Sequence, residues 1–310
     1  MGPTAAGKTD LALDIAQRFP VEIISVDSAL VYRGMDIGTA KPNARILSQY
    51  PHHLVDIIEP TDSYSVGAFR TDALRLMDEI TNRGKIPLLV GGTMLYFKGL
   101  EQGLADLPIA DMDIRARLDY EAKQQGWTHL HQRLTNIDPI SAARIHINDP
   151  QRLQRALEVY EITGKTLTEL TNATHTQLPF RITKVIVSPF NRAVLHQRIA
   201  ERYNKMVSNG FLEEAWELFN RDDCHSDLPA IRAVGYRQAW SHFSGEYDRD
   251  TMIDKAIIAT RQMAKRQITW LRSQPDAVWF DSGNELPLQE ITNFIIERCP
   301  ELTVQPQLIQ

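Results

Sequence analysis

The chain has 310 residues, a formal net charge of −5, 43% hydrophobic residues and 24% charged residues, a composition that excludes an intrinsically disordered protein. Its length allows one large domain or two modest ones. The two cysteines, Cys224 and Cys299, lie far apart in the sequence, which excludes a disulfide scaffold and a cysteine-rich zinc site. The longest apolar runs are too short to span a bilayer, so we expect a cytoplasmic protein.

The first third of the chain alternates between strand and helix patterns. Hydrophobic spacing predicts helices over residues 10–18 and 65–83, and β-branched runs predict strands over residues 21–26, 53–58 and 86–90. This alternation is typical of parallel βαβ units. Later elements are predicted as strands over 182–187 and 277–280, and as helices over 192–209, 211–220, 249–273 and 286–298.

The hydrophobic pattern of the sequence changes after about residue 110. From there to residue 178 the spacing is helical and no convincing strand occurs. We therefore predict an α/β fold, a P-loop NTPase-like parallel sheet core flanked by helices, with an all-helical insertion. The core comprises residues 1–110 and 179–310, and the insertion comprises residues 111–178.

The clearest motif lies at the start of the chain, where residues 2–9 match G-x-x-x-x-G-K-[ST]. In such loops the backbone N–H groups surround a phosphate, the lysine neutralises its charge and the hydroxyl ligates Mg²⁺. The predicted phosphate site consists of Gly2, Pro3, Thr4, Ala5, Ala6, Gly7, Lys8 and Thr9, with Thr9 as the metal ligand.

The strand that usually precedes this motif is missing, because only Met1 stands before it. A parallel sheet without that strand is expected to leave an apolar slot and unpaired backbone groups.

Two polar positions follow predicted strands. Asp27 ends the strand over 21–26, at the carboxyl edge of the sheet where ligands of α/β proteins bind. It suits a Mg²⁺ ligand, a general base or a helix N-cap. Gly91-Gly92-Thr93 follows the strand over 86–90 and should face the same crevice, unless it is a plain tight turn.

Basic side chains gather on two predicted helices. Residues 228–272 carry 8 basic and 4 acidic side chains, net +4. On the helix over 249–273, Arg261, Lys265 and Arg272 fall within about 40° of one another. Phosphates of a nucleic acid would explain this stripe, and so would a structural ion-pair network. On the helix that begins at Pro150, Gln151, Arg152 and Arg155 share one side, which a solvated helix face explains as well.

Together these segments resemble one family, the tRNA dimethylallyltransferases, also called tRNA isopentenyltransferases. The matching stretches cover nearly the whole chain in order, and several are specific to that family. They are residues 2–9, 25–29 (Ser-Val-Asp-Ser-Ala), 35–42 (Met-Asp-Ile-Gly-Thr-Ala-Lys-Pro), 89–93 (Leu-Val-Gly-Gly-Thr), 148–152 (Asn-Asp-Pro-Gln-Arg), 231–238 (Ile-Arg-Ala-Val-Gly-Tyr-Arg-Gln) and 260–272.

The resemblance implies a reaction and its partners. The dimethylallyl group of dimethylallyl diphosphate would move to N6 of the adenosine just 3′ of the anticodon, in tRNAs that read codons beginning with U. It also implies Mg²⁺ as cofactor and a monomer without an obligate protein partner. The target adenosine must leave the stacked anticodon loop, so contacts along the loop have to offset that cost.

The same resemblance assigns the site residues. The catalytic group is Asp27 as general base, with Lys8, Thr93 and Arg232 holding the diphosphate. The tRNA path comprises Asp27, Ser28, Ala29, Leu30, Thr93, Arg115, Gln151, Arg152, Leu153, Gln154, Arg155, Arg232, Ala233, Val234, Gly235, Tyr236, Arg237, Lys265 and Arg272, and the insertion would hold the anticodon stem.

Three other functions use some of these features. A small-molecule or nucleotide kinase also has a P-loop, but it needs a contact to a nucleotide γ-phosphate and an arginine-rich lid. A dimethylallyltransferase for free adenine nucleotides needs neither the long insertion nor the late basic helix. A non-enzymatic RNA-binding module leaves the P-loop unexplained.

Overall fold

The computed structural model describes residues 1–103, 105, 107–172 and 178–300, and it divides the chain into two compact units. One unit comprises Met1–Lys98 with Phe180–Gln310, and the other comprises Gly99–Pro179. Each unit has its own hydrophobic core, as expected for a chain of this length. The smaller unit begins at residue 99, whereas the sequence placed the insertion from residue 111.

Two small parallel sheets lie in the larger unit. The first has the strand order β2-β1-β3, and the second pairs β4 with β5. The last four residues of β1 are buried, because β1 is central in its sheet and is built from β-branched residues. The strands are β1 (Val21–Val26), β2 (His52–His53), β3 (Ile86–Gly91), β4 (Lys184–Ser188) and β5 (Ala277–Asp281).

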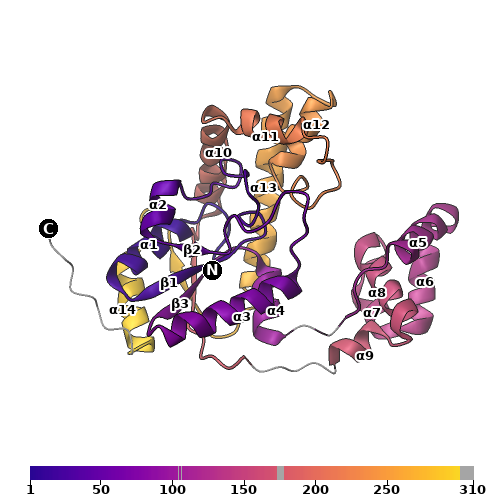
Figure 1. Ribbon diagram of the computed structural model, residues 1–310, viewed down its shortest axis with the longest axis horizontal. Coiled ribbons are helices and arrows are strands. Elements are labelled where there is room, and N and C mark those ends of the chain that lie inside the picture. Colours follow the sequence, from indigo (N-terminus) through magenta and orange to yellow (C-terminus); the bar gives the residue numbers. More distant parts are fainter. Residues whose placement is uncertain (104, 106, 173–177, 301–310) are drawn as a thin grey trace. The chain divides into compact units, whose positions relative to one another are not determined.

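Helices pack against these strands and on one another (Figure 1). Helices α1 and α3 contact β1 and β3, and α14 contacts α1. The helices that begin before the second unit are α1 (Lys8–Arg18), α2 (Ala44–Gln49), α3 (Val66–Asn82) and α4 (Met94–Gln102), and the last residues of α4 belong to that unit. Those after it are α10 (Arg192–Ser208), α11 (Phe211–Phe219), α12 (Tyr236–Phe243), α13 (Arg249–Leu271) and α14 (Leu288–Arg298). The unit is therefore mixed α/β.

The helices α10 to α13 form a second layer of the larger unit, drawn from brown through orange in Figure 1. Their core includes the fully buried Phe211 and Met252, together with Met35 from the loop after β1. This packing brings a long loop that follows β1 onto α11, although about 175 residues separate them in the sequence.

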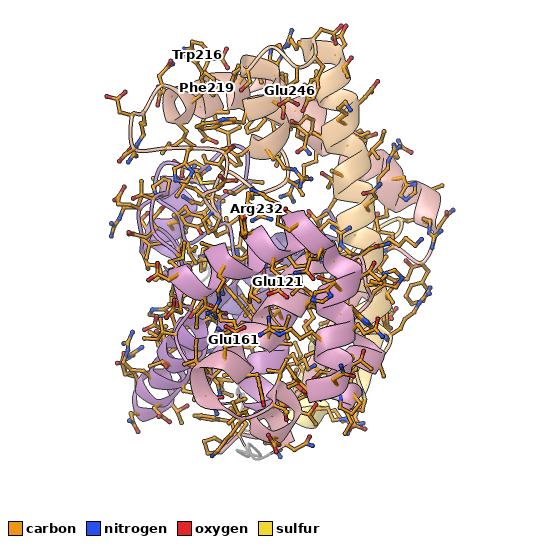
Figure 2. All side chains as sticks on the ribbon, turned by 90° about the vertical axis from the view of Figure 1, so that its right-hand side faces the viewer. Glu121, Glu161, Trp216, Phe219, Arg232 and Glu246 are labelled. Carbon is orange, nitrogen blue, oxygen red and sulfur yellow. The ribbon has the colours of Figure 1, made fainter. Side chains whose placement is uncertain are left out.

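Among its described residues the smaller unit contains helices and no strand, as the spacing predicted. Its helices are α5 (Met112–Gln125), α6 (Trp127–Ile137), α7 (Pro139–Arg144), α8 (Pro150–Thr163) and α9 (Leu167–Asn172). Asp149 caps α8 by accepting from the Arg152 N–H, and Pro150 occupies its first turn. Around the core, Arg133 joins Glu121 to Glu161, which are labelled in Figure 2.

The predicted strand over 53–58 is wrong. β2 contains only His52 and His53, because Leu54 (φ 64°) and Asp56 (φ 55°) adopt left-handed backbone conformations that interrupt an extended chain. Ile58 forms a single parallel bridge to Tyr32 in the loop after β1, outside the sheet.

Met1 forms backbone hydrogen bonds to β4, at the place where the missing strand before the loop of residues 2–9 was expected. The Met1 amino group donates to the Val185 carbonyl at 2.8 Å, and the Val187 N–H donates to the Met1 carbonyl at 3.0 Å. A side chain at Gly2 would collide with the Val187 carbonyl, and the Gly2 carbonyl lies against Gly92 at the end of β3. Met1 and Gly2 thus lie between the carboxyl ends of β3 and β4.

An added strand at this position should stabilise the protein. Burial and the charge of Lys8 lower the pKa of the Met1 amino group to about 5, so this amine is poorly placed as a charged group. Six apolar, β-branched residues added before Met1 should replace the amine by a peptide and pair along β4, raising the melting temperature by several degrees. A Gly-Ser extension of equal length is the control, and equal melting temperatures for the two would contradict the prediction.

Candidate active site

The loop of residues 2–7 leads into α1 with an unusual backbone. Ala5 (φ 61°) and Gly7 (φ 87°) both adopt left-handed conformations, and α1 starts directly afterwards at Lys8. The Lys8 side chain folds back over the loop and donates from Nζ to the Pro3 carbonyl at 2.6 Å. Directly after β5, the buried Ser282 donates from Oγ to the Ala6 carbonyl at 3.0 Å. The loop is therefore held from within and from the neighbouring sheet.

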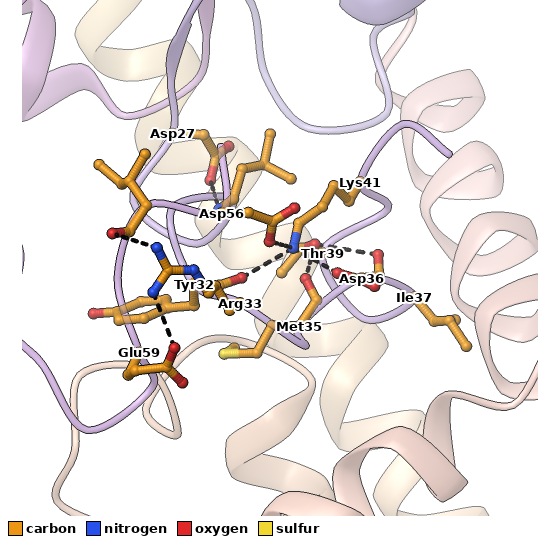
Figure 3. Close-up of polar contacts among 12 residues, drawn as sticks. Asp27, Tyr32, Arg33, Met35, Asp36, Ile37, Thr39, Lys41, Asp56 and Glu59 are labelled. Carbon is orange, nitrogen blue, oxygen red and sulfur yellow. Dashed lines mark hydrogen bonds and ion pairs between the residues drawn. The ribbon is translucent and has the colours of Figure 1, made fainter. Parts of the chain in front are cut away.

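Asp27 stands immediately after β1 and is half-buried. Its Oδ1 accepts hydrogen bonds from the N–H groups of Ala29 (2.8 Å) and Leu30 (3.4 Å), which shapes a tight turn. These residues do not begin a helix, so the N-cap interpretation of Asp27 does not hold in this structure. Figure 3 shows this contact beside the ion pairs of Lys41.

Thr93, which follows the neighbouring strand β3, forms hydrogen bonds to the residues on both sides of Asp27. Its N–H donates to the Val26 carbonyl at 3.1 Å, and its Oγ1 accepts from the Ser28 N–H at 3.0 Å. The sequence placed both residues at the carboxyl edge of the sheet, and the structure brings them together there. Thr93 thereby fixes the backbone on both sides of the carboxylate.

Arg202 completes the charge pattern and was missed by the sequence analysis. It projects from α10, donates from Nη2 to the Thr39 carbonyl at 3.3 Å, and interacts electrostatically with Asp27 and Lys8. Burial, followed by the charge of Arg202, lowers the pKa of Lys8 to about 8, while Asp27 acts in the opposite direction. Two partly buried cations thus lie within electrostatic range of one carboxylate, an arrangement that suits an added anion.

A signal for Arg202 is present in the sequence. It lies seven residues after Leu195, so at 100° per residue the two positions differ by only about 20° and share the apolar stripe of α10. A cation on a buried stripe requires a compensating anion, which marks the position as unusual.

Lys41 belongs, like Asp36, to the stretch of residues 35–42 that resembles the family. Its ammonium group is buried and forms hydrogen bonds and ion pairs within the protein. Its Nζ donates to the Tyr32 carbonyl at 2.9 Å and to carboxylate oxygens of Asp36 and Asp56 (Figure 3). Only 3% of its side chain is exposed. Lys41 therefore holds the loop after β1 in place.

The exposed members of the predicted tRNA path lie on four segments. Arg232, labelled in Figure 2, and Arg237 are exposed next to the start of α12, and Lys265 and Arg272 are exposed on and just after α13. Ser28 is exposed beside Asp27, and Gln151 and Arg152 are exposed at the start of α8. Ala29, Leu30, Ala233 and Val234 are half-buried, whereas Gly235 is buried.

Two other members of the path are buried. Leu153 belongs to the core of the helical unit, and Tyr236 is 2% exposed with its hydroxyl donating to Glu214. Neither therefore offers its side chain to a ligand at the surface.

Arg115 and Arg155 are committed to a buried carboxylate. Arg115 donates to both oxygens of Glu158, at 2.8 and 3.1 Å, and Arg155 donates to it at 2.6 Å and also to the Pro108 carbonyl. Glu158 is fully buried, and its pKa is lowered by these arginines against the opposing effect of burial. Gln154 similarly donates to the Arg115 carbonyl and to Asp119. This cluster has a structural role, and a contact of these residues with tRNA stays a prediction.

Comparison with known proteins identifies the family. A family model described as IPP transferase matches residues 30–274. The crystal structure of a full-length tRNA isopentenylpyrophosphate transferase from Bacillus halodurans is 38% identical, with a TM-score of 0.71 over 97% of this chain and 95% of that one. The chain belongs to the IPP transferase family.

Two further structures extend this result. A tRNA delta(2)-isopentenylpyrophosphate transferase from Staphylococcus epidermidis is 32% identical, with a TM-score of 0.68 over 96% of this chain and 97% of that one. A eukaryotic dimethylallyltransferase acting on tRNA is 24% identical and shows the same fold, with a TM-score of 0.83 over 99% of this chain and 80% of that one. The chain is thus an enzyme, an IPP transferase. Among its described residues, no helix is long and apolar enough to cross a membrane.

Proposed function

We propose that the enzyme transfers the dimethylallyl group from dimethylallyl diphosphate to N6 of the adenosine 3′-adjacent to the anticodon, in tRNAs that read codons beginning with U. The observation that supports this most is the meeting of Lys8, Arg202 and Asp27 beside the loop of residues 2–7. Two cations suit a diphosphate, and a carboxylate beside them suits proton removal from an amine.

The loop of residues 2–9 is the proposed phosphate site, which makes the larger unit a P-loop core. Backbone N–H groups at the start of α1 and the dipole of that helix favour a bound anion. Lys8 and Arg202 neutralise charge that develops on the departing diphosphate, and Arg232 adds a third cation. The donor, not a nucleotide, would occupy this loop.

The proposed reaction follows from these positions. The C1–O bond of the allylic diphosphate breaks, with the electron pair leaving on diphosphate, and a bond forms between C1 and the adenine N6. The amine loses a proton as the bond forms, and the Asp27 carboxylate accepts it. Thr93 fixes the turn that carries Asp27, so the carboxylate is oriented before the substrates arrive.

Mg²⁺ is the proposed cofactor, and the residues present fit it. The described residues contain no group of three or more His, Cys, Asp or Glu side chains placed to hold a metal. Mg²⁺ typically keeps several waters and is held by one or two protein ligands plus substrate phosphates. Thr9, exposed in the first turn of α1, would supply such a ligand. Bound there, Mg²⁺ would supply charge neutralisation for the diphosphate.

The decisive experiment is incubation with labelled dimethylallyl diphosphate and unmodified tRNA, followed by nucleoside analysis. Label in N6-dimethylallyladenosine at the position after the anticodon is the expected result. Parallel reactions with AMP and with labelled ATP test the alternatives. Label in free AMP would support a nucleotide prenyltransferase, and transfer of phosphate from ATP would support a kinase. Either result, without label in tRNA, would overturn the proposal.

Arg152 provides the cleanest test of the proposed tRNA path. Its side chain is 73% exposed and forms an ion pair with Asp149 at 3.3 Å, so its removal disturbs little of the protein. Arg152→Ala should weaken tRNA binding and reduce the slope of log K against log salt by about 0.7 to 0.9, the loss of one phosphate contact. Affinity measured between low and high salt provides the check.

Arg155→Ala is the matched comparison for Arg152. Because it removes a partner of the buried Glu158, it should instead lower the stability of the helical unit, by up to about 3–5 kcal/mol, the usual cost of breaking a buried ion pair. An unchanged salt slope in Arg152→Ala would place this residue on an ordinary solvated helix face.

A further inference from the structure

Gln267 joins the two loops that carry the candidate active site. Its side-chain amide, on α13, accepts through Oε1 from the Thr4 N–H at 3.0 Å and donates through Nε2 to the Gly92 carbonyl at 2.8 Å. Thr4 belongs to the P-loop, and Gly92 directly precedes Thr93. The oxygen and the nitrogen of one planar amide therefore each form a hydrogen bond, and each bond goes to a different loop.

The space around this amide is tightly defined. A side chain at Gly92 would bring its Cβ to 2.6 Å from Gln267 Nε2, so it would displace the Gln267 amide from this position. Gln267 is half-buried, which makes its two hydrogen bonds less exposed to competition from water than those of a surface residue.

The connection continues from Gly92 to Asp27. Thr93 donates its N–H to the Val26 carbonyl and accepts at Oγ1 from the Ser28 N–H, so it holds the residues on either side of Asp27. A continuous path thus runs from the P-loop through Gln267 to the turn at Gly92 and Thr93, and from there to the carboxylate. Its members come from α13, the P-loop, β3 and β1.

The position of Gln267 on α13 adds a third component. Lys265, a predicted tRNA contact, precedes it by two residues, so at 100° per residue the two side chains point to nearly opposite sides of the helix. Lys265 is exposed, whereas Gln267 faces the loops. The helix that is predicted to contact tRNA is thereby attached to the donor loop.

We infer that Gln267 is a positioning residue. It fixes the position of the P-loop, and hence of the diphosphate, relative to the Asp27 carboxylate. This inference rests on the proposed function of the site. Gln267 touches neither reacting atom. It acts through Thr4 on the donor and through Gly92 and Thr93 on the general base. Misplacement of reacting groups by about 1 Å can cost on the order of 100-fold in rate, so a loss of this link should affect chemistry and not only stability.

The test uses Gln267→Met, which keeps the length of the side chain but forms neither hydrogen bond. The matched control is Gln262→Met, the same change at an exposed position of the same helix. We expect kcat/KM for dimethylallyl diphosphate to fall about 10- to 100-fold in Gln267→Met, with the dissociation constant for tRNA within about twofold of wild type. The control should match wild type in both.

A double-mutant cycle with Thr93→Ala separates positioning from a general loss of packing. If Gln267 acts through the turn at Thr93, the effects of the two substitutions on kcat should be strongly non-additive, the double variant being little slower than the slower single variant. Additive effects, or an unchanged kcat/KM in Gln267→Met, would overturn the inference. Should Gln267→Met fail to fold, Gln267→Leu is measured in the same cycle.

The affinity for inorganic diphosphate, measured by calorimetry, keeps this test distinct from the proposed function. A wild-type enzyme that forms no prenylated tRNA would refute the function. A wild-type enzyme that is active, with Gln267→Met binding inorganic diphosphate and turning over as well as wild type, would refute only the role of Gln267.

Discussion

Replacing Asp27 by Asn should slow prenyl transfer by about 10²- to 10⁴-fold while both substrates still bind. Asn keeps the size of the side chain and an oxygen for the Ala29 and Leu30 N–H groups, so the turn is preserved. It cannot accept the proton from the adenine N6, and loss of a general base typically costs this much. Single-turnover rates with saturating tRNA and donor provide the measurement.

The same variant separates the remaining interpretations of Asp27. A Mg²⁺ ligand would instead lose metal-dependent binding of the diphosphate, with partial recovery at higher Mg²⁺ concentrations. Asp222→Asn, at an exposed position of a turn, is the control for a general effect of removing one negative charge. Full activity of Asp27→Asn would rule out the general-base role.

Replacing Lys8 by Ala should weaken binding of dimethylallyl diphosphate by about 10- to 100-fold. Hydrogen bonds to charged groups contribute about 1.5–3 kcal/mol, which corresponds to that range of dissociation constants. The affinity for tRNA should stay within about twofold, because Lys8 folds over the loop of residues 2–7 toward Pro3. Isothermal calorimetry with each substrate alone provides the two values.

Lys205→Ala, which removes an exposed lysine near the end of α10, is the control for a change in overall charge. A fall in tRNA affinity without a fall in donor affinity would show that the diphosphate does not bind at residues 2–9. Arg202 should keep part of the donor affinity in Lys8→Ala, since it interacts with the same group of charges.

Local patterns predicted the elements around the site well. β1 and β3 are runs of apolar residues, and α3 has regular helical spacing from its Ser65 cap to Asn82. The carboxyl edge of parallel strands then places Asp27 and Thr93 together without further information. The strand predicted over 53–58 failed because Leu54 and Asp56 adopt backbone conformations that are unfavourable for their residue types, a choice imposed by distant contacts such as the Lys41–Asp56 pair.

Long-range partners explain what the sequence could not reveal about the site. Arg202 interacts electrostatically with Asp27 and Lys8 from a helix at least 170 residues further along the chain. Its place on the apolar stripe of α10 is a signal in the sequence that the sequence analysis overlooked. Helical periodicity places Arg155 on the polar face of its helix. Its guanidinium nevertheless donates a hydrogen bond to Glu158 within the same unit. A pattern of charges along one helix does not show which of them already have partners.

The loop after β1 contains a second group of backbone donors, and Glu214 of α11 decides what they bind. The N–H groups of Asp36, Ile37 and Gly38 all donate to its carboxylate, at 2.8, 2.7 and 3.0 Å, and the Tyr236 hydroxyl donates to it as well. Three successive amides of this kind attract phosphate in other loops. Here a free phosphate would have to displace a carboxylate that is tethered by the chain and present at a very high local concentration. Glu214 thus satisfies these donors within the protein, so the three amides are not available to another anion while these hydrogen bonds are intact.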